Sequence, residues 1–391
     1  MASTPFTLAA LATSAVPGLE VTGTRPHTSG SGGAFTSAVL STDRGEAIVR
    51  VPANSAAEVQ QSAELLGIAA LAGGARSSLP FSVPETLGVT RAGDTRAVVS
   101  TFLLGSPASI ALLETSSDLL RDTAEAIAAI HSLPTAIVRD SGLPDRGAAE
   151  VRTLATRLVQ RAAETGMLPA TVRQRWNEVL EASRVWSFET TVVHGSLAPE
   201  SLLVDESGLR GVIGWHALGT GDPAEDLAWL LDAESGTFEA VLARYSTKRG
   251  LSGQRELTAR ARFYHELEVA KWLLHGFDTH DQGIIDDAVS MLDRLVDRLS
   301  ILGTVVPQRE VLSEQEVERM LDETPEIDYD SRSETAEFES LDEDRAFGAD
   351  FDFGDGEGNG NGDGNVAERD GHADHTDRDD RAVPGGEASS R

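Results

Sequence analysis

The sequence predicts a mixed α+β protein in which a small β-rich lobe precedes a larger, mainly helical lobe. Residues 18–52 alternate short apolar runs with glycine- and serine-rich turns, which is typical of antiparallel strands. Residues 112–186 and 223–302 carry apolar side chains at helical spacing. A compact β segment at residues 190–215 separates these two helical stretches, and its last two strands form a hairpin. We therefore expect a two-lobed molecule.

A single long helix is predicted within the small lobe, at residues 55–72. Ser55 and Glu58 have the spacing of a capping box at its start. Its apolar side chains are predicted to share one face, at Val59, Leu66 and Ala70. Two more strands are predicted after this helix, at residues 84–90 and 96–103.

The acidic residues are concentrated at the end of the chain. The formal net charge is −30, and residues 301–391 account for −19 of it, with 27 acidic and eight basic side chains. Such a segment cannot bury enough apolar surface to offset its chain entropy, so it is expected to be disordered. The predicted organisation is an N-lobe at residues 1–103, a C-lobe at residues 104–305 and an acidic tail at residues 306–391, with one short helix at residues 312–323.

Composition excludes several classes of protein. An acidic chain of this kind lacks the basic surface of a nucleic-acid-binding protein. The absence of cysteine excludes disulfides, thiolate catalysis and cysteine-ligated zinc. No apolar run reaches the length of a membrane span, and the first apolar stretch has no basic residue before it, unlike a signal peptide. We expect a cytoplasmic protein without a membrane partner. Only two lysines are present, Lys248 and Lys271.

The most informative stretch is residues 192–231, VVHGSLAPESLLVDESGLRGVIGWHALGTGDPAEDLAWLL. It resembles the signature of the aminoglycoside and macrolide phosphotransferase family, which includes choline-kinase-like enzymes and shares the protein-kinase fold. The resemblance is carried by His194-Gly195, Pro199, the strands at residues 202–204 and 211–213, Gly221-Asp222-Pro223 and Asp226-Leu227-Ala228.

This resemblance implies a protein-kinase-like fold and, for an active member, transfer of phosphate from ATP or GTP with Mg²⁺ to a small hydroxylated molecule. Weaker likeness extends over about residues 20–300. Residues 46–52 resemble the strand that carries the phosphate-binding cation, and residues 98–105 resemble the strand that enters the hinge between the lobes.

The departures from the family pattern fall on the catalytic groups. Phosphoryl transfer needs a carboxylate that accepts the substrate's proton and oxygen ligands that hold magnesium. The resemblance implies that these groups belong at Ser196 for the base and at Ser201 and Gly214 for the metal. Serine has no basic function at neutral pH without an activating partner, and glycine has no side chain.

Other residues of this stretch have both structural and chemical interpretations. Glu200 is a loop charge or a substitute ligand, and Asp205 is a turn residue or a ligand. Asp222 is a helix N-cap or a weak candidate for the metal. The resemblance implies that Asp226 holds the catalytic loop in place and that His194 orients it.

The nucleotide side of the site also leaves alternatives open. Gly30 and Gly32 belong to a glycine-rich loop that either covers phosphates or is a plain hairpin turn. With no lysine in the first 247 residues, Arg50 is the candidate phosphate-binding cation on its strand, and Glu64 is its implied ion-pair partner. The strand that enters the hinge contributes Ser100 and Phe102.

We interpret the chain as a member of this family that has lost phosphoryl transfer, a pseudokinase with a binding or regulatory role. The alternative is an active small-molecule O-phosphotransferase that uses Glu200 or Asp222 on a rearranged metal site. A third hypothesis is a scaffold that binds no nucleotide. The acidic tail, in which Phe347, Phe351 and Phe353 stand among carboxylates, is either a solvating extension or a segment that binds a protein partner or a basic patch.

Overall fold

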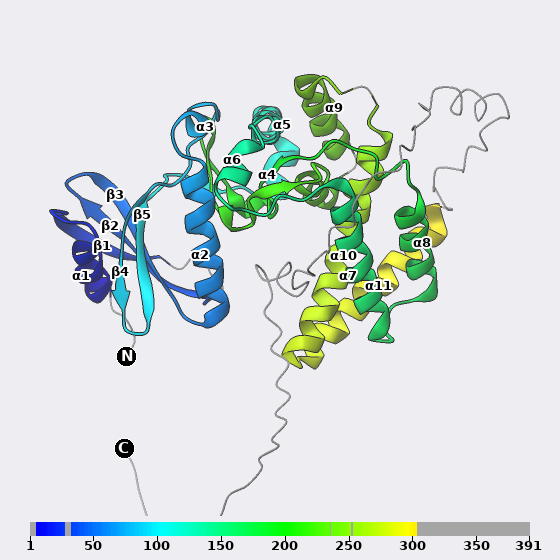
Figure 1. Ribbon diagram of the computed structural model, residues 1–391, viewed down its shortest axis with the longest axis horizontal. Helices are drawn as coiled ribbons and strands as arrows, with labels where there is room; N and C mark the ends of the chain where they lie inside the picture. The colour runs from blue at the N-terminus through cyan, green and yellow to red at the C-terminus, as the bar shows by residue number, and fades with distance from the viewer. Residues whose placement is uncertain (1–4, 28–32, 235, 252, 303–391) are drawn as a thin grey trace, which may run out of the picture. The chain divides into compact units, whose positions relative to one another are not determined.

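The computed structural model describes residues 5–27, 33–234, 236–251 and 253–302 (Figure 1). The predicted acidic tail with its short helix lies outside these residues, and so do Gly30 and Gly32. The mixed α+β class is confirmed, with a β-sheet lobe at the N-terminal end and a mainly helical lobe after it. Across the described ranges, no helix combines the length and the apolar character that crossing a membrane requires.

The N-lobe is an antiparallel five-stranded sheet with the strand order β1-β2-β3-β5-β4. Its strands are β1 (Val21–His27), β2 (Phe35–Thr42), β3 (Gly45–Pro52), β4 (Thr86–Ala92) and β5 (Thr95–Thr101). In Figure 1, helix α1 (Pro5–Ala15) lies against one face of this sheet and helix α2 (Ser55–Ala70) against the other. A short helix, α3 (Gly74–Ser77), follows α2.

Helix α1 is an element that the sequence analysis did not predict. Its residues Leu8 and Ala12 are fully buried against the apolar face of the sheet, which contains Val49 and Val99. The contact is close enough that a Cβ atom on Gly88 of β4 would overlap the carbonyl oxygen of Ala15. This N-terminal stretch is therefore part of the lobe's core.

One detail of the predicted helix at residues 55–72 is wrong. The N-cap is Asn54, whose Oδ1 accepts a hydrogen bond from the backbone N–H of Ala57 at 2.8 Å, and not Ser55. Val59, Leu66 and Ala70 do share one side of the helix, as their spacing predicted, and Val59 and Leu66 on that side are exposed. The buried residues of α2 are instead Ala57, Gln61, Gly67 and Ile68.

The C-lobe contains eight α-helices in the described residues, connected by short strands and 3-10 turns. The helices are α4 (Ile110–Thr115), α5 (Ser117–His131), α6 (Ala136–Asp140), α7 (Ala148–Glu164), α8 (Ala170–Glu181), α9 (Thr237–Arg249), α10 (Arg255–Thr279) and α11 (Gln282–Leu302). The strands are β6 (Ser106–Pro107), β7 (Thr191–Val193), β8 (Leu202–Asp205), β9 (Gly208–Val212) and β10 (Gly219–Gly221). The predicted hairpin is β8-β9. The 3-10 turns are η1 (Pro199–Ser201), η2 (Trp215–Ala217) and η3 (Glu225–Asp232).

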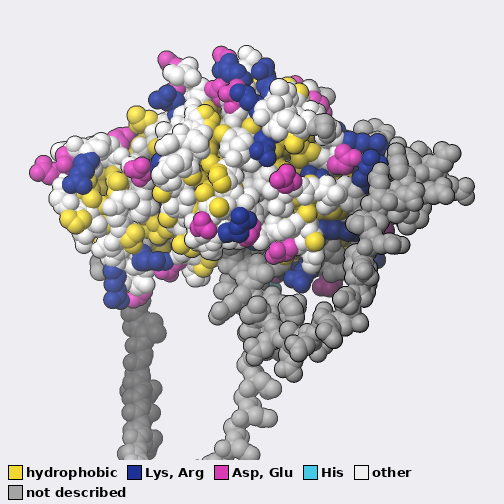
Figure 2. All heavy atoms as spheres, turned by 45° about the horizontal axis from the view of Figure 1, so that its top comes forward, with side chains coloured by type: hydrophobic (Ala, Val, Ile, Leu, Met, Phe, Trp, Pro, Cys, Tyr) yellow, Lys and Arg dark blue, Asp and Glu magenta, His cyan; other side chains and the backbone are white. Residues whose placement is uncertain are grey.

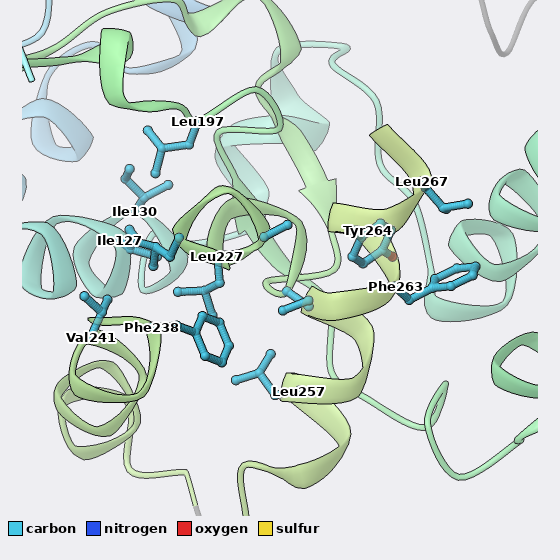
Figure 3. Packing of buried hydrophobic residues seen from close by; sticks show 14 of the residues in the cluster. Ile127, Ile130, Leu197, Leu227, Phe238, Val241, Leu257, Phe263, Tyr264 and Leu267 are labelled. Carbon is cyan, nitrogen blue, oxygen red and sulfur yellow. The ribbon is translucent and has the colours of Figure 1, made fainter. Parts of the chain in front are cut away.

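The C-lobe core fixes the loop between β7 and β8. Figure 3 shows Leu197 of this loop above Ile127 and Ile130 of α5, and Leu227 of η3 beside Phe238 of α9. All five side chains are buried in one continuous cluster. Apolar packing therefore fixes both ends of the segment that carries the family signature.

Helix α2 of the N-lobe packs directly on η2 of the C-lobe. Trp215 of η2 is fully buried, and its indole Nε1 donates to the carbonyl oxygen of Val212 at 2.9 Å. A Cβ atom on Gly67 would overlap the carbonyl oxygen of Trp215. Residue 67 must consequently be glycine for this approach to be possible.

The Gly67→Ala variant is expected to lower the free energy of unfolding by about 1–3 kcal/mol, because the added methyl group has no space against a backbone carbonyl. Chemical denaturation measures this change. Gly74→Ala is the matched control, since no atom lies within 4 Å of a Cβ at that position. Equal stability of the two variants would contradict the close packing of α2 on η2.

Candidate functional site

The signature loop is held by the carboxylate of Asp226, which is fully buried. Its Oδ2 accepts from the backbone N–H of His194 at 2.7 Å, and its Oδ1 accepts from the N–H of Gly195 at 2.8 Å. Gly195 has φ +78°, a left-handed conformation that suits glycine, and a Cβ there would meet the carbonyl oxygen of Ala217. The expectation that Asp226 holds the loop is confirmed.

A second layer of hydrogen bonds stabilises this carboxylate. The Nε2 atom of His131 lies 3.0 Å from Asp226 Oδ2, and its Nδ1 lies 2.8 Å from the Tyr245 hydroxyl. Burial alone would raise the pKa of Asp226. The hydrogen bonds from His131 and from the backbone N–H of His194 oppose this effect, so the pKa is lowered and the carboxylate stays ionised.

His194 connects the loop to the residue that directly follows β9, the second strand of the hairpin. Its Nε2 lies 3.0 Å from the carbonyl oxygen of Ile213, so this nitrogen carries the proton and donates it. Its Nδ1 is then an acceptor, 3.4 Å from Ser196 Oγ. Burial lowers the pKa of the imidazole, which is therefore neutral. This geometry matches the expected orienting role.

The three positions that the sequence resemblance implied for the base and the metal ligands lie together. Ser196 Oγ donates to the carbonyl oxygen of Gly214 at 3.2 Å. A Cβ atom on Gly214 would lie 3.8 Å from Ser201 Oγ and 3.8 Å from His194 Cε1, which are ordinary contact distances. The fold thus brings Ser196, Ser201 and Gly214 to one place, where their side chains supply two hydroxyl groups and no charge.

The other carboxylates of this stretch have different surroundings. Glu200 is exposed on η1. Asp205 Oδ1 accepts from the N–H of Ser207 at 2.7 Å in the hairpin turn, and its Oδ2 lies 3.1 Å from Arg210 Nε. Among the residues that the structure describes, no three histidine, aspartate or glutamate side chains form a group that could hold a metal ion.

Asp222 has partners for both of its carboxylate oxygens. Arg260 Nε donates to Oδ2 at 2.6 Å and the Tyr264 hydroxyl donates to the same atom at 3.1 Å. Oδ1 accepts from the N–H of Ala224 at 2.9 Å in the turn before η3, whose N-cap is Ala224 and not Asp222 as the sequence suggested. Asp222 is fully buried, and burial raises its pKa although Arg260 opposes that effect. These contacts fasten the start of η3 to α10.

Arg50 and Glu64 form the ion pair that the resemblance implied. Arg50 Nη1 donates to Glu64 Oε2 at 2.8 Å, and the guanidinium lies 4.0 Å from the centre of the Phe35 ring. The backbone carbonyl of Arg50 accepts from Gln61 Nε2 of α2 at 3.2 Å. The Arg50 side chain is 30% exposed, so its cationic group remains within reach of a ligand.

Two residues of β1, Arg25 and His27, lie against the ring of Phe102 and were not predicted from the sequence. Phe102 follows β5, and its ring has Arg25 at 5.1 Å and His27 at 5.7 Å, both from β1. Arg25 also donates to both carboxylate oxygens of Glu46 at 2.9 Å. Burial lowers the pKa of His27, and the charges of Arg25 and Arg50 lower it further.

Strand register explains how these cations come to share a face. Ser37 of β2 is opposite both His27 of β1 and Arg50 of β3, so all three side chains project from the same face of the sheet. Ser100 is on this face too, opposite Ile48. Alternation along β1 could indicate that Arg25 and His27 share one face of the strand. It could not indicate which residues lie beside them, because that depends on the register of β1 with β2.

The chain belongs to the phosphotransferase enzyme family (APH), whose sequence model matches residues 25–297. The uncharacterized protein YcbJ of Bacillus subtilis is 25% identical over 193 residues, which are 46% of this chain and 60% of that protein. The chain therefore matches less than two thirds of the length of this curated relative.

Solved structures show the same fold. Macrolide 2'-phosphotransferase MphH from Brachybacterium faecium, an apoenzyme, has a TM-score of 0.62 and 21% identity over 74% of this chain and 98% of that one. The GDP and kanamycin complex of APH(2")-IIIa has a TM-score of 0.61 and 15% identity, with 74% and 98% covered. The resemblance seen in the sequence and the kinase-like two-lobed fold are confirmed.

The half-buried Glu225 of η3 predicts a pH dependence. Burial raises its pKa from 4.5 to about 7, Asp226 and Asp222 raise it too, and Lys271 and Arg146 oppose the shift. Between pH 4.5 and about 7, the Glu225 carboxyl is therefore protonated in the folded chain and ionised in the unfolded chain. This contribution to stability is complete below pH 4.5 and disappears as the pH rises through about 7.

Glu225→Gln, which stays neutral, is expected to gain stability relative to the parent chain between pH 5 and pH 8. Urea denaturation at the two pH values measures the difference. The exposed Glu200→Gln serves as the control and should show no such gain. A stability difference for Glu225→Gln that does not change with pH would contradict the assigned proton uptake.

Proposed function

We propose that this chain keeps the nucleotide-binding frame of its family, lacks metal-assisted phosphoryl transfer, and acts as a binding or regulatory module. The observation that carries the proposal is the convergence of Ser196, Ser201 and Gly214 at one place without a carboxylate. In a kinase-like site, catalysis is almost entirely positioning plus charge stabilisation. A site without these charges can hold a nucleotide but does not activate it.

The side chains at the metal-ligand positions do not fit magnesium. Mg²⁺ is usually bound through one or two carboxylates together with phosphate oxygens. Here Ser201 provides an uncharged hydroxyl and Gly214 provides no side chain. We therefore derive no step through this ion.

The base position is equally unsuited to proton transfer from a substrate hydroxyl. Ser196 Oγ makes its shorter contact, at 3.2 Å, to the carbonyl oxygen of Gly214. The imidazole of His194 is 3.4 Å from the same hydroxyl, is fully buried, and uses its other nitrogen on Ile213. A neutral, buried imidazole at this distance is a positioning group and not a general base.

Support for nucleotide binding comes from the N-lobe. The carboxylate of Glu64 is 2.8 Å from Arg50 Nη1 and holds the guanidinium in one orientation. Arginine can bind a phosphate group with two parallel hydrogen bonds. Structurally similar proteins are described as GDP complexes. We infer that the ligand is ATP or GTP, bound by Arg50 and by the hinge segment that contains Ser100 and Phe102, with or without a small hydroxylated molecule.

The alternative of an active enzyme with a rearranged metal site is not favoured by the contacts of Asp222. Both of its oxygens have protein partners, and Arg260 would lose its buried counter-ion if Asp222 moved to a metal. Removing one partner of a buried ion pair costs about 3–5 kcal/mol. Glu200 is exposed on η1 and has no second carboxylate in a metal-binding group with it among the described residues.

Restoring the missing groups tests the proposal. The triple variant Ser196→Asp, Ser201→Asn, Gly214→Asp is expected to gain magnesium-dependent nucleotide hydrolysis, with the parent about 10²–10⁴-fold slower. The Gly214 position has space for a side chain, and its φ of +85° is tolerated best by aspartate and asparagine.

The control for this gain is Ser196→Asn, Ser201→Asn, Gly214→Asn, which has similar shape without the charges and should stay inactive. Hydrolysis is followed by phosphate release with and without magnesium. Robust magnesium-dependent turnover by the parent chain would refute the proposal.

Arg50 is the second point at which the proposal can fail. Arg50→Ala is expected to weaken nucleotide binding about 10- to 100-fold, because a charge-assisted hydrogen bond contributes about 1.5–3 kcal/mol. Arg44→Ala is the matched control, an exposed arginine in the turn between β2 and β3 that should leave affinity unchanged. Fluorescence anisotropy with a labelled nucleotide measures both, and equal affinities would remove Arg50 from the site.

A further inference from the structure

An apolar patch on the N-lobe has no part in the proposed function. Its members, on α2 and β4, are 41% to 53% exposed: Val59, Leu66 and Val89. Exposed apolar side chains that occur singly are common, whereas a contiguous group of them marks an interaction site. In Figure 2, hydrophobic side chains are spread over the visible face of the molecule among polar and charged ones.

The contacts of Arg96 show that these side chains are neighbours. Arg96 of β5 donates through Nη2 to Ser62 Oγ of α2 at 2.5 Å, so its side chain is on the α2 face of the sheet. Arg91 of β4 is directly opposite Arg96, and Val89 is two residues before it, so both share this face. Leu66 is one turn after Ser62 on the same side of the helix.

The patch is consequently an apolar surface with a cationic border. We define the α2–β4 patch as Val59, Leu66, Val89, Arg91 and Arg96. The two arginines stand at the end of β4 and the start of β5. An occupant that fits this surface has apolar anchors and negative charge close together in sequence.

The chain itself contains such a segment. Residues 341–351, LDEDRAFGADF, include four carboxylates and one arginine, with Phe347 and Phe351 four residues apart. We propose that this segment docks on the α2–β4 patch, with the two phenylalanines on the apolar side chains and the carboxylates beside Arg91 and Arg96. The inference does not depend on whether the chain transfers phosphate.

The length of chain is sufficient for this contact. Helix α11 ends at Leu302, which leaves 44 residues before Phe347. A flexible chain of that length has a root-mean-square span of about 35–40 Å and a maximal reach several times larger. A tethered segment also has an effective concentration in the millimolar range, so weak docking suffices.

Disulfide trapping in the full chain tests the proposal, since the natural sequence has no cysteine to interfere. Ala69→Cys is exposed on α2, one turn from Leu66, and Ala349→Cys lies between the two phenylalanines. Under mild oxidation, this pair is expected to cross-link within one chain at least about tenfold faster than the control pair Met167→Cys with Ala349→Cys. Met167 is 47% exposed in the C-lobe.

Adding Phe347→Ser and Phe351→Ser to the trapping pair is expected to reduce its rate to that of the control pair. These changes lie in the tail segment and leave the described lobes intact, so a lost cross-link reports docking and not unfolding. Equal rates for the two cysteine pairs overturn the proposal. Cross-links that join two chains and depend on protein concentration also overturn it, because the occupant would then be a second copy.

Discussion

The buried carboxylate of Asp226 is the interaction on which the rest of the site depends. It accepts two backbone N–H groups of the signature loop and a hydrogen bond from His131, all without access to water. Leaving one such buried donor unpaired costs about 1–3 kcal/mol, so the loop, α5 and η3 form one unit. His194 then extends this unit to Ile213, which fixes where positions 196, 201 and 214 must lie.

This frame is independent of the chemistry that a kinase fold usually performs. Asp226 and His194 position the backbone, and Asp222 with Arg260 fastens η3 to α10. None of them needs a metal ion or a substrate to satisfy its hydrogen bonds. The groups that would act on a phosphate are separate side chains on the same loops. The hydrogen bonds of the frame do not involve these side chains, so family membership and catalytic competence are separate questions for this protein.

The sequence predicted those parts of the structure that depend on short-range patterns. The β8-β9 hairpin, the clamp by Asp226 and the Arg50–Glu64 pair all follow from local motifs or from a family signature. Helix α1 was missed because its apolar residues become a core element only when a sheet is present to cover. The shared face of Val59, Leu66 and Ala70 was predicted from helical spacing, but spacing identifies a face and not what covers it, and Val59 and Leu66 are exposed. The positions of Arg25 and His27 beside Phe102 could not be predicted from the sequence, because they depend on the strand register.

The most direct test of the central claim is calorimetric titration of ATP and GTP into the full chain, with and without magnesium at equal ionic strength. A nucleotide frame without a metal site predicts binding that depends on Arg50 and changes little when magnesium is added. Magnesium that tightens binding by about tenfold or more, a difference of about 1.4 kcal/mol, would contradict the claim, because it would show that the chain has a working metal site.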